Sequence, residues 1–394
     1  MLNGITANIT DRSVKRIMII YHCKAKTGYA IETLERTFWE TAKTITGNVE
    51  DIHLCYKSYS SGYPNYTPLG FNNFYQLDPT ESDTKKLVEF QKYIKNHGIT
   101  IIFGFDQPPN LSYYRYARNG GVSRIISYYG APMSSLNSGI RLMLKRLQVK
   151  LYRYIPDLFI FESRAMQETA YNGRGIPKEK TAVCHLGIDT TKFIPDERDR
   201  FYAHDMLNLD KDQKLIFYSG HFEPRKGISV IIEAANSILE ERSDVTFILF
   251  GNQQGEEKEF AEKLNEAAEK HVIFGGYRKD LNRMHRACYA GVIASTGWDS
   301  FTVSSLEMQA SGLPLLVSDL DGLNEAIDQH RTGSLFNPGD SNELKNLLVN
   351  LLDNPDKRNS MSHSARQHIE QHFSLEKQVS RLKSLVQGHQ ETLD

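Results

Sequence analysis

Short apolar runs alternate with amphipathic stretches along most of the chain. The runs at residues 17–21, 99–105 and 158–162 have the length of strands, and the stretches at 28–45 and 84–97 repeat apolar positions with helical spacing. Strands joined by such helices form parallel sheets, because parallel strands need crossover connections. The pattern therefore predicts an α/β fold built on parallel sheets.

The first half of the chain predicts one such sheet and the second half another. Between them, residues 190–214 are charged and poor in apolar side chains, which is typical of a linker. Further elements of the first half are strands at 51–56 and 124–128, helices at 136–154 and 164–172, and an ordered aromatic loop at 58–78. The segment 181–185 closes this half. The second half predicts strands at 215–218, 245–250, 272–274, 290–294 and 314–317, helices at 228–240, 256–270, 281–287, 301–310 and 323–327, and a helical tail at 342–385.

The composition is that of a globular protein without an excess of charge. Lysine and arginine number 47, aspartate and glutamate 48, and this balance excludes a global basic surface for nucleic acid. The 4 cysteines are scattered without a Cys-x-x-Cys pair, which excludes a disulfide scaffold or a Cys-rich zinc site and favours a reducing cytosol. No apolar run approaches the about 20 residues of a membrane-spanning helix, and residues 1–16 lack the apolar core of a signal peptide.

The turn after the expected strand at 215–218 carries glycine and cations. It reads Ser-Gly-His-Phe-Glu-Pro-Arg-Lys-Gly over residues 219–227 and leads into a helix. Glycine permits close backbone approach and a helix N-terminus favours anions. Arg225 and Lys226 add positive charge, a combination that suits a diphosphate. A solvated turn with two surface cations explains the same residues equally well.

A second candidate site follows the expected strand at 290–294. Asp299 lies in the loop before a helix, and Glu307 lies about two turns into it. The amides of residues 300–303 lie near the free helix end, where they can bind phosphate or sugar oxygens. The two carboxylates can accept hydrogen bonds from hydroxyl groups. A capped amphipathic helix with a surface glutamate is the usual alternative at this spacing.

Together these segments resemble the nucleotide-sugar site of the retaining glycosyltransferases of family 4 (glycosyl transferases group 1), which have the GT-B fold. The family often carries Gly-Arg-Leu-x-x-x-Lys-Gly, matched here from Gly220 to Gly227. It also carries Glu-x7-Glu ending in Leu-Glu-Ala-Met-Ala-x-Gly-x-Pro, matched here from Asp299 to Pro314. Weaker matches follow the family's order at residues 186–195, 274–277, 321–325 and 332–340.

The resemblance implies a GT-B fold of two Rossmann-like, doubly wound domains facing each other across a cleft. An acceptor-side domain would span 1–195 and a nucleotide-sugar-binding domain 196–373, with a helix over 374–394 packing back on the first domain. Lys226 and Arg225 would act in catalysis by neutralising the donor diphosphate, with Asp299 beside the transferred sugar. The implied substrate-binding residues are Gly28, Tyr129, Gly220, His221, Gly276, Tyr277, Ser300, Phe301, Thr302, Val303 and Glu307.

Within that set, Glu307 would hold the ribose hydroxyls, and Gly276 with Tyr277 would border the base. Some positions depart from the family pattern. His221 stands where arginine is common, and Asp299 is one methylene shorter than the usual glutamate. Where the family has a histidine after the strand that ends near residue 128, this chain has a tyrosine pair followed by glycine. A tyrosine such as Tyr129 can hydrogen-bond a sugar there, but its phenol does not readily shuttle protons at neutral pH.

The resemblance implies no cofactor and no metal ion, because helix ends and cations take the place of the ion that other glycosyltransferases use. Asp319 and Asp321 form an Asp-x-Asp pair, for which a turn at a strand end is the favoured interpretation. No histidine cluster has the spacing of metal ligands.

The expected helix near residues 140–154 has an apolar face bordered by arginine and lysine. Such a helix can contact an anionic membrane that carries a lipid-linked acceptor. A helix packed in the core with a solvated rim is the favoured interpretation. The expected location is therefore the cytoplasm, with peripheral contact at the inner face of the membrane as the alternative.

Taken together, the residues and the resemblance favour a retaining hexosyltransferase of bacterial polysaccharide biosynthesis. The donor would be a UDP-sugar, with UDP-glucose chosen on family frequency alone, and the acceptor a hydroxyl of a glycan or lipid-linked glycan. A nucleotide-sugar epimerase and a non-catalytic GT-B protein that binds a partner transferase or a glycan remain open. A dinucleotide oxidoreductase is less well supported, because residues 22–28 lack the Gly-x-Gly-x-x-Gly pattern.

Overall fold

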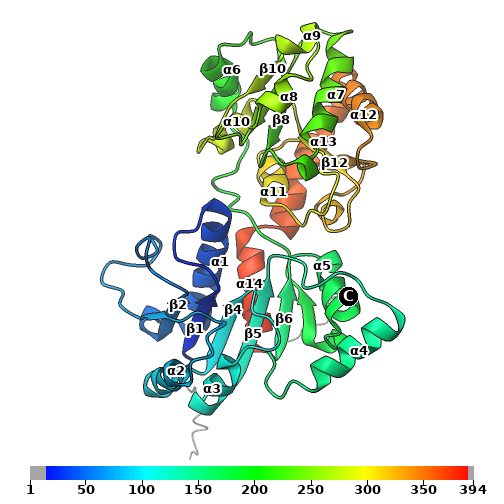
Figure 1. Cartoon of the computed structure of the whole chain (residues 1–394). Helices are drawn as coiled ribbons and strands as arrows, with labels where there is room; N and C mark the ends of the chain where they lie inside the picture. The colour runs from blue at the N-terminus through cyan, green and yellow to red at the C-terminus, as the bar shows by residue number, and fades with distance from the viewer. Residues whose placement is uncertain (1–14, 389–394) are drawn as a thin grey trace, which may run out of the picture. The chain divides into compact units, whose positions relative to one another are not determined.

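The computed structural model of the chain describes residues 15–388, which form two compact units (Figure 1). The first unit contains the described residues up to Phe161, the segment Thr169–Ala182 and the chain from Val379 onward. The second unit contains Glu162–Glu168 and Val183–Gln378. Each unit is built on its own parallel sheet, which confirms the predicted α/β class with two Rossmann-like sheets.

The first sheet has the strand order β3-β2-β1-β4-β5-β6-β7. Its central strand β1 (Ile17–Tyr21) pairs in parallel with β2 (Ile52–Tyr56) and β4 (Ile101–Phe105). All 5 residues of each of these three strands are buried, because a parallel strand is covered on both faces. The other strands are β3 (Phe74–Gln76), β5 (Arg124–Tyr129), β6 (Leu158–Phe161) and β7 (Thr181–Val183).

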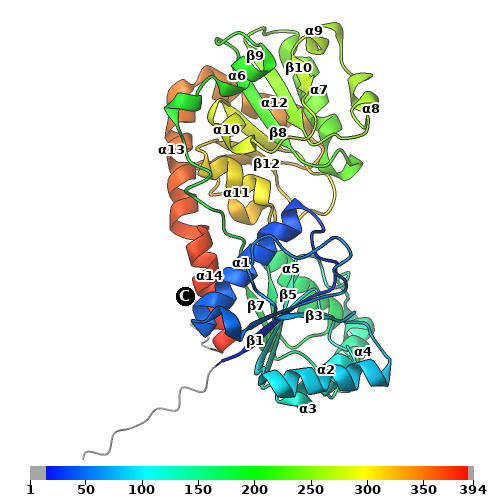
Figure 2. The ribbon, with the colours of Figure 1, turned by 90° about the vertical axis from the view of Figure 1, so that its left-hand side faces the viewer.

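Helices cover both faces of this sheet (Figure 2). Phe38 of α1 (Tyr29–Thr46) stacks on Tyr21 of β1. On the other face, α2 (Thr84–His97) and α3 (Tyr113–Gly120) share an apolar core with Met18 and Ile20. Alternate residues of β1 thus serve different helical layers, as the two-residue period of a strand requires.

The second sheet has the strand order β10-β9-β8-β11-β12-β13, all in parallel pairs. One apolar core lies on the side of α7 (Ile228–Leu239) and α12 (Ser341–Asp353), and another on the side of α10 (Leu281–Arg286) and α11 (Val303–Ala310). The strands are β8 (Lys214–Ser219), β9 (Val245–Phe250), β10 (Val272–Phe274), β11 (Ala290–Ile293), β12 (Leu315–Ser318) and β13 (Gly333–Phe336).

The prediction of a linker at 190–214 is wrong. The two units divide nearer the N-terminus than the predicted boundary at 195. The segment contains α6 (Tyr202–Leu207), and the division between the units lies at Ala182 and Val183. The chain after this point is tied to α13 (Pro355–His372), since Arg366 donates to the carbonyl oxygens of Thr190 and Phe193.

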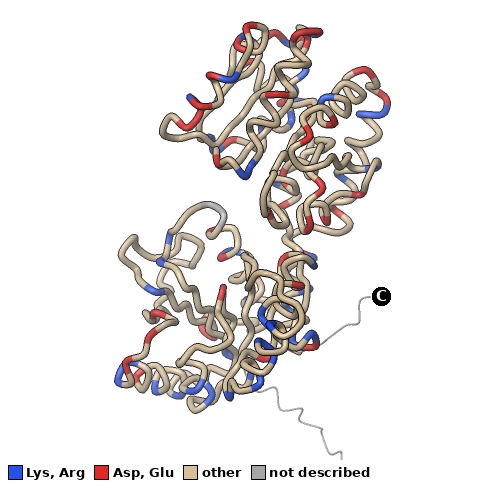
Figure 3. The backbone as a smooth tube through the Cα atoms, turned by 45° about the vertical axis from the view of Figure 1, so that its right-hand side comes forward, with Lys and Arg blue, Asp and Glu red and all other residues tan. Residues whose placement is uncertain are grey.

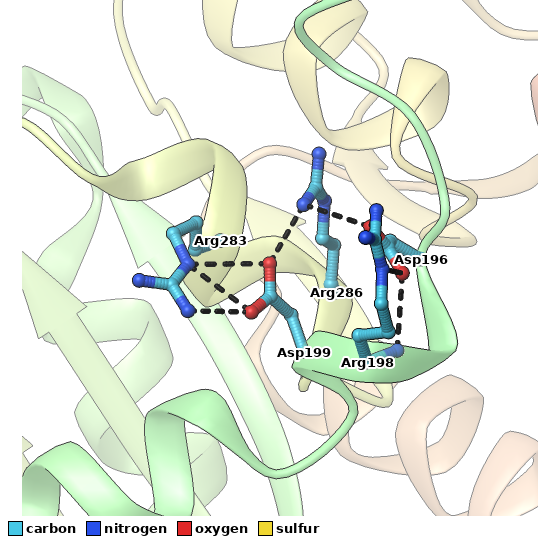
Figure 4. A pocket seen from close by; sticks show the side chains of 5 residues that line it. All are labelled: Asp196, Arg198, Asp199, Arg283 and Arg286. Atoms are coloured by element: carbon cyan, nitrogen blue, oxygen red, sulfur yellow. Dashed lines mark hydrogen bonds and ion pairs between the residues drawn. The ribbon is translucent and has the colours of Figure 1, made fainter.

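Ion pairs explain why the charged composition of this segment was misleading. Asp199 accepts hydrogen bonds from Arg283 and Arg286 of α10, each at 2.7 Å, and Arg286 also lies 3.6 Å from Asp196 (Figure 4). With Arg198, these side chains line an open cavity of about 370 Å³. These ion pairs hold the segment against α10, whereas the charged side chains of a linker would face solvent.

Other elements also differ from the sequence prediction. β3 lies inside the expected aromatic loop, and α3 and β13 were not expected. The expected helix at 256–270 is broken into α8 (Lys258–Ala261) and α9 (Glu266–Glu269), because the Asn265 side chain accepts from the amide of Ala268 and starts a new helix. The predicted C-terminal helix is α14 (Leu375–Gln387), and Arg124 of β5 donates to the carbonyl oxygen of Leu385 at 2.9 Å. Residues 389–394 of that prediction lie outside the described residues.

A buried carboxyl group on α1 gives the first unit a pH-dependent stability. Burial raises the pKa of Glu35 to about 7, although a hydrogen bond with Tyr56 opposes the shift. The unfolded chain releases this proton near the ordinary pKa of 4.5 and the folded chain near 7, so the folded chain holds more protons between these values. The free energy of unfolding therefore falls as the pH rises through this window.

We expect Glu35→Gln to remove this dependence. The difference between the two pKa values of Glu35 corresponds to a fall in the free energy of unfolding of up to about 3 kcal/mol between about pH 4.5 and about pH 7. Urea unfolding across this range should show a flatter profile for the variant. Glu40→Gln, on the same helix but with its side chain 45% exposed, is the matched control. A variant profile parallel to that of the wild type would contradict the assignment.

Candidate functional site

The strand order of the second sheet places two loops side by side. From β8 the chain moves outward through β9 and β10, and it then returns to add β11, β12 and β13 on the other side. β8 and β11 are neighbours that flank the point where the strand order reverses. In open parallel sheets, ligands bind beyond the carboxyl ends of the strands at such a point. The loops after Ser219 and Ile293 therefore form the candidate site.

Two glycines allow the backbone to converge at this edge of the sheet. Gly227 follows the turn Pro224–Lys226 with a φ of 69°, and a Cβ there would overlap the carbonyl oxygen of Ala294. Gly251, with a φ of 125°, follows β9, and a Cβ there would overlap the carbonyl oxygen of Gly220. Both positions combine a left-handed φ with a close backbone approach, which only glycine accommodates.

The structure brings two predicted catalytic residues together as an ion pair. Lys226 Nζ lies 2.7 Å from Asp299 Oδ2. Asp299 also accepts from the Ser295 hydroxyl at 2.7 Å and from the amide of Ser300 at 3.1 Å. The carboxylate is thus held by groups from both loops, and it fixes the direction of the lysine side chain.

Arg225 lies beside this pair and is more exposed. Its Nη1 donates to the carbonyl oxygen of Trp298 at 3.1 Å and lies 3.9 Å from Asp299 Oδ1. Its Nε donates to Glu223 at 2.8 Å. Glu223 was not among the predicted site residues, although it stands in the same turn and reduces the net positive charge there. The ion pair with Arg225 depends on the fold of the turn, which spacing alone does not show.

The second predicted segment begins its helix later than expected. α11 starts at Val303, with Thr302 as the N-cap residue, so Ser300 and Phe301 precede the helix. The Phe301 ring packs against His185 and is only 2% exposed, so its side chain belongs to the core. The roles of the amides over residues 300–303 stay predictions.

Glu307 and the predicted base-side residues lie on different elements of the second unit. Glu307 is buried on α11. Gly276 has a φ of 67°, its amide donates to Asn252 Oδ1 at 2.9 Å, and its carbonyl oxygen accepts from Gly251. Tyr277 is exposed and follows this turn. Asn252, which supports the turn, was missed because a single asparagine after a strand gives no distinctive signal.

The matched motif at 321–325 has a structural role in this unit. Glu325 accepts hydrogen bonds from the amides of Arg164 and Ala165 and pairs with His185 Nε2 at 2.9 Å. Burial acts to raise the pKa of Glu325, but these hydrogen bonds outweigh it and hold the pKa below its ordinary value. The carboxylate therefore remains charged and anchors the short helix α5 (Arg164–Glu168).

Two predicted residues lie in the first unit. Gly28 precedes α1 with a φ of 150°, and a Cβ there would meet no atom within 4 Å. The Tyr129 ring is buried against Phe161, and burial raises the pKa of its hydroxyl. Contact between Tyr129 and a sugar stays a prediction. Within residues 15–388, no three His, Cys, Asp or Glu side chains gather as metal ligands would.

The helix predicted at 136–154 is shorter and packs differently from the favoured interpretation. α4 (Gly139–Lys150) buries only Val149, whereas its apolar side chains face solvent with exposed fractions between 51% and 79%. These are Ile140, Met143, Leu144, Leu147 and, just beyond the helix, Leu151. The preference for a core-packed helix is therefore wrong.

The charged residues of α4 are all basic. Acidic and basic residues are interspersed over both units (Figure 3), but α4 contains Arg141, Lys145, Arg146 and Lys150 and no acidic residue. No helix within residues 15–388 is both long and apolar enough to span a bilayer.

Two parallel Rossmann-like sheets, with a candidate site at the strand reversal of the second, define a GT-B glycosyltransferase fold. Residues 199–368 match the family model described as glycosyl transferases group 1. This match confirms the resemblance noted in the sequence.

Relatives and solved structures agree with this resemblance. A galactosyltransferase of Escherichia coli, named UDP-Gal:alpha-D-GlcNAc-diphosphoundecaprenol alpha-1,3-galactosyltransferase, is 24% identical over 77% of this chain and 79% of its own length. The D-inositol 3-phosphate glycosyltransferase of Corynebacterium urealyticum is 27% identical over 59% of this chain and 57% of its own length.

Among solved structures, a glycosyltransferase from Rickettsia africae has a TM-score of 0.77 at 13% identity, covering 96% of this chain and 100% of its own. Anabaena HepE in complex with UDP has a TM-score of 0.74 at 18% identity, covering 95% and 100%. These two structures share the fold of the chain.

The close approach at Gly227 leads to a stability prediction. We expect Gly227→Ala to lower the free energy of unfolding by about 2 kcal/mol or more, because left-handed strain adds to the overlap with Ala294. Gly339→Ala is the control, since Gly339 has a φ of 86° but open space around its Cβ position. Chemical denaturation compares the two variants. Equal losses would show that the approach to Ala294 carries no energetic weight.

Proposed function

We propose that the chain transfers a hexose from a nucleoside diphosphate sugar to a hydroxyl of a glycan or lipid-linked acceptor. The favoured donor is UDP-glucose. The observation that carries the proposal is the pair of cations, Arg225 and Lys226, at the strand reversal of the second sheet, with Glu307 buried on the helix beside it. The name of the E. coli relative supports a UDP-sugar donor and a diphosphoundecaprenol-linked acceptor. A relative from Corynebacterium glutamicum is GDP-mannose-dependent, so the base is a question for experiment.

Each residue has a defined role in this proposal. The Lys226 ammonium has three donors, of which Asp299 takes one, so the others can bind diphosphate oxygens. Arg225 adds a second cation. Glu307 accepts hydrogen bonds from the ribose hydroxyls, while Gly276 and Tyr277 border the base.

In the transfer step, the bond between the anomeric carbon and the diphosphate oxygen breaks, and the acceptor hydroxyl oxygen bonds to that carbon. The acceptor proton passes to the leaving diphosphate, so the products are the glycoside and the nucleoside diphosphate. Attack from the face that the diphosphate leaves retains the anomeric configuration. Arg225 and Lys226 stabilise the charge that develops on the leaving group, which is the role a metal ion has in other transferases.

Nucleotide titration tests the donor site. We expect calorimetry to show binding of one among UDP, GDP and ADP, with UDP favoured. Lys226→Ala should weaken it by about 10-fold or more, because a charge-assisted contact with the phosphates is lost. Glu307→Gln should have a similar effect through the ribose.

Lys270→Ala, an exposed lysine of the same unit, is the matched control for charge. Thermal unfolding identifies variants that lose binding because they lose the fold. Failure of the wild type to bind any of the three nucleotides would reject the transferase proposal and favour a non-catalytic protein. Release of a free epimer from the UDP-sugar without an acceptor would instead indicate an epimerase.

We also propose that α4 contacts the anionic membrane surface at which a lipid-linked acceptor resides. The exposed apolar residues supply burial in the interface, and the basic residues attract anionic headgroups. Because the apolar face is exposed rather than packed, this contact does not require the helix to leave the core.

Vesicle co-sedimentation tests the membrane contact. The full chain should bind vesicles of phosphatidylcholine with phosphatidylglycerol, and Leu144→Glu with Leu147→Glu should reduce the partition by about 10-fold or more. Met206→Glu, an exposed apolar residue of the second unit, is the control. Unchanged partition of the α4 double variant, or equal binding to neutral vesicles, would contradict the proposal.

A further inference from the structure

The first sheet has its own strand reversal, and two side chains stand beside it that no prediction included. The chain leaves β1 for β2 and β3 and then returns to add β4 on the other side of β1. His22 follows β1 and Asp106 follows β4, and the register pairs Tyr21 with Phe105 immediately before them. The two side chains are therefore brought together at the place where an open parallel sheet binds ligands.

The backbone at Asp106 is held in an unfavourable conformation. Its φ is 50°, in the left-handed region that residues other than glycine seldom adopt. The amide of Asp106 donates to the carbonyl oxygen of Tyr128 at 2.7 Å, and Asp106 Oδ1 accepts from the amide of Gly130 at 3.0 Å. These contacts fix the carboxylate at the edge of the sheet. Strain of this kind is concentrated at functional sites.

The remaining polar atoms of the pair suit a hydroxyl group. His22 Nδ1 lies 3.3 Å from the carbonyl oxygen of Phe105 and 4.0 Å from Asp106 Oδ2. Among residues 15–388, neither His22 Nε2 nor Asp106 Oδ2 has a hydrogen-bond partner, and both side chains are partly exposed. A hydroxyl donates one hydrogen bond and accepts others, so it can satisfy a carboxylate and an imidazole together. A phosphate would be repelled by the carboxylate.

The electrostatic surroundings keep this carboxylate close to its titration range. Burial raises the pKa of Asp106 to about 6, against the opposing effects of the Gly130 amide and of His22. The other titratable groups that face it are Cys23 and Tyr129. Above about pH 6 the group is ionised and accepts hydrogen bonds, and below this value it is protonated.

We infer that His22 and Asp106 bind a hydroxyl of the acceptor sugar and position it at the carboxyl edge of the first sheet. The inference rests on the proposed transferase function and assigns the acceptor side of that function to named residues. Sequence reasoning named Gly28 and Tyr129 after strands of the first half, but it did not single out His22 or Asp106, whose proximity depends on the strand order.

Binding of simple glycosides to the full chain tests this inference. The probes are the methyl glycosides of glucose, galactose, mannose and N-acetylglucosamine, measured by saturation-transfer NMR. At least one should bind the wild type, and Asp106→Asn and His22→Gln should each weaken it by about 10-fold or more. Affinity of the wild type should fall as the pH drops through about 6, and that of Asp106→Asn should not.

Asp83→Asn is the control, because it removes one charge from the first unit and keeps an N-cap residue on α2. UDP titration of each variant separates this inference from the donor site. If the wild type binds UDP but no glycoside, or if both variants bind the glycoside normally, the inference is overturned and the donor site stands. If a glycoside binds as expected and no nucleotide does, the donor site fails and the sugar contact stands.

Discussion

Parallel pairing between β8 and β11 is the constraint on which the candidate donor site depends. It brings together two loops whose sequences are about 70 residues apart, and Lys226 meets Asp299 only because of it. The same pairing forces the backbone after β8 against Ala294, and Gly227 relieves that contact. Backbone convergence and the ion pair are thus two results of one arrangement of strands.

The paired state of Lys226 affects how a ligand would meet the site. A buried carboxylate without a cation would be costly, so the lysine has a structural role as well as its proposed role toward phosphate. Arg225 is more exposed and is shared between Glu223 and the loop at Trp298. A donor diphosphate would compete with Glu223 and Asp299 for these cations. The affinity for the donor therefore reflects an exchange of ion-pair partners rather than binding to unpaired cations.

Much of the fold could be predicted because buried parallel strands are continuous apolar runs, as in β1 and β9. The three-residue strand β3 could not, since it is too short to show a period. The pairing of Asp199 with Arg283 and the burial of Glu35 depend on contacts between distant segments, which composition does not show. The candidate donor residues could be placed after their strands, but their mutual contacts required the strand order. His22 and Asp106 were overlooked for the same reason, because only the strand order shows that they are neighbours.

The three-segment construction of the first unit has a consequence for dissecting the chain. Its sheet is completed by β7, and Arg124 of β5 binds the backbone of α14, far along the sequence. A fragment ending at Phe161 would lack β7 and expose the hydrogen-bonding edge of β6, which favours self-association. Removal of α14 would likewise take away a helix that the first unit binds, while all strands of the second sheet would remain. No single cut in the chain therefore separates the two units, because segments of the first unit lie on both sides of the second in sequence.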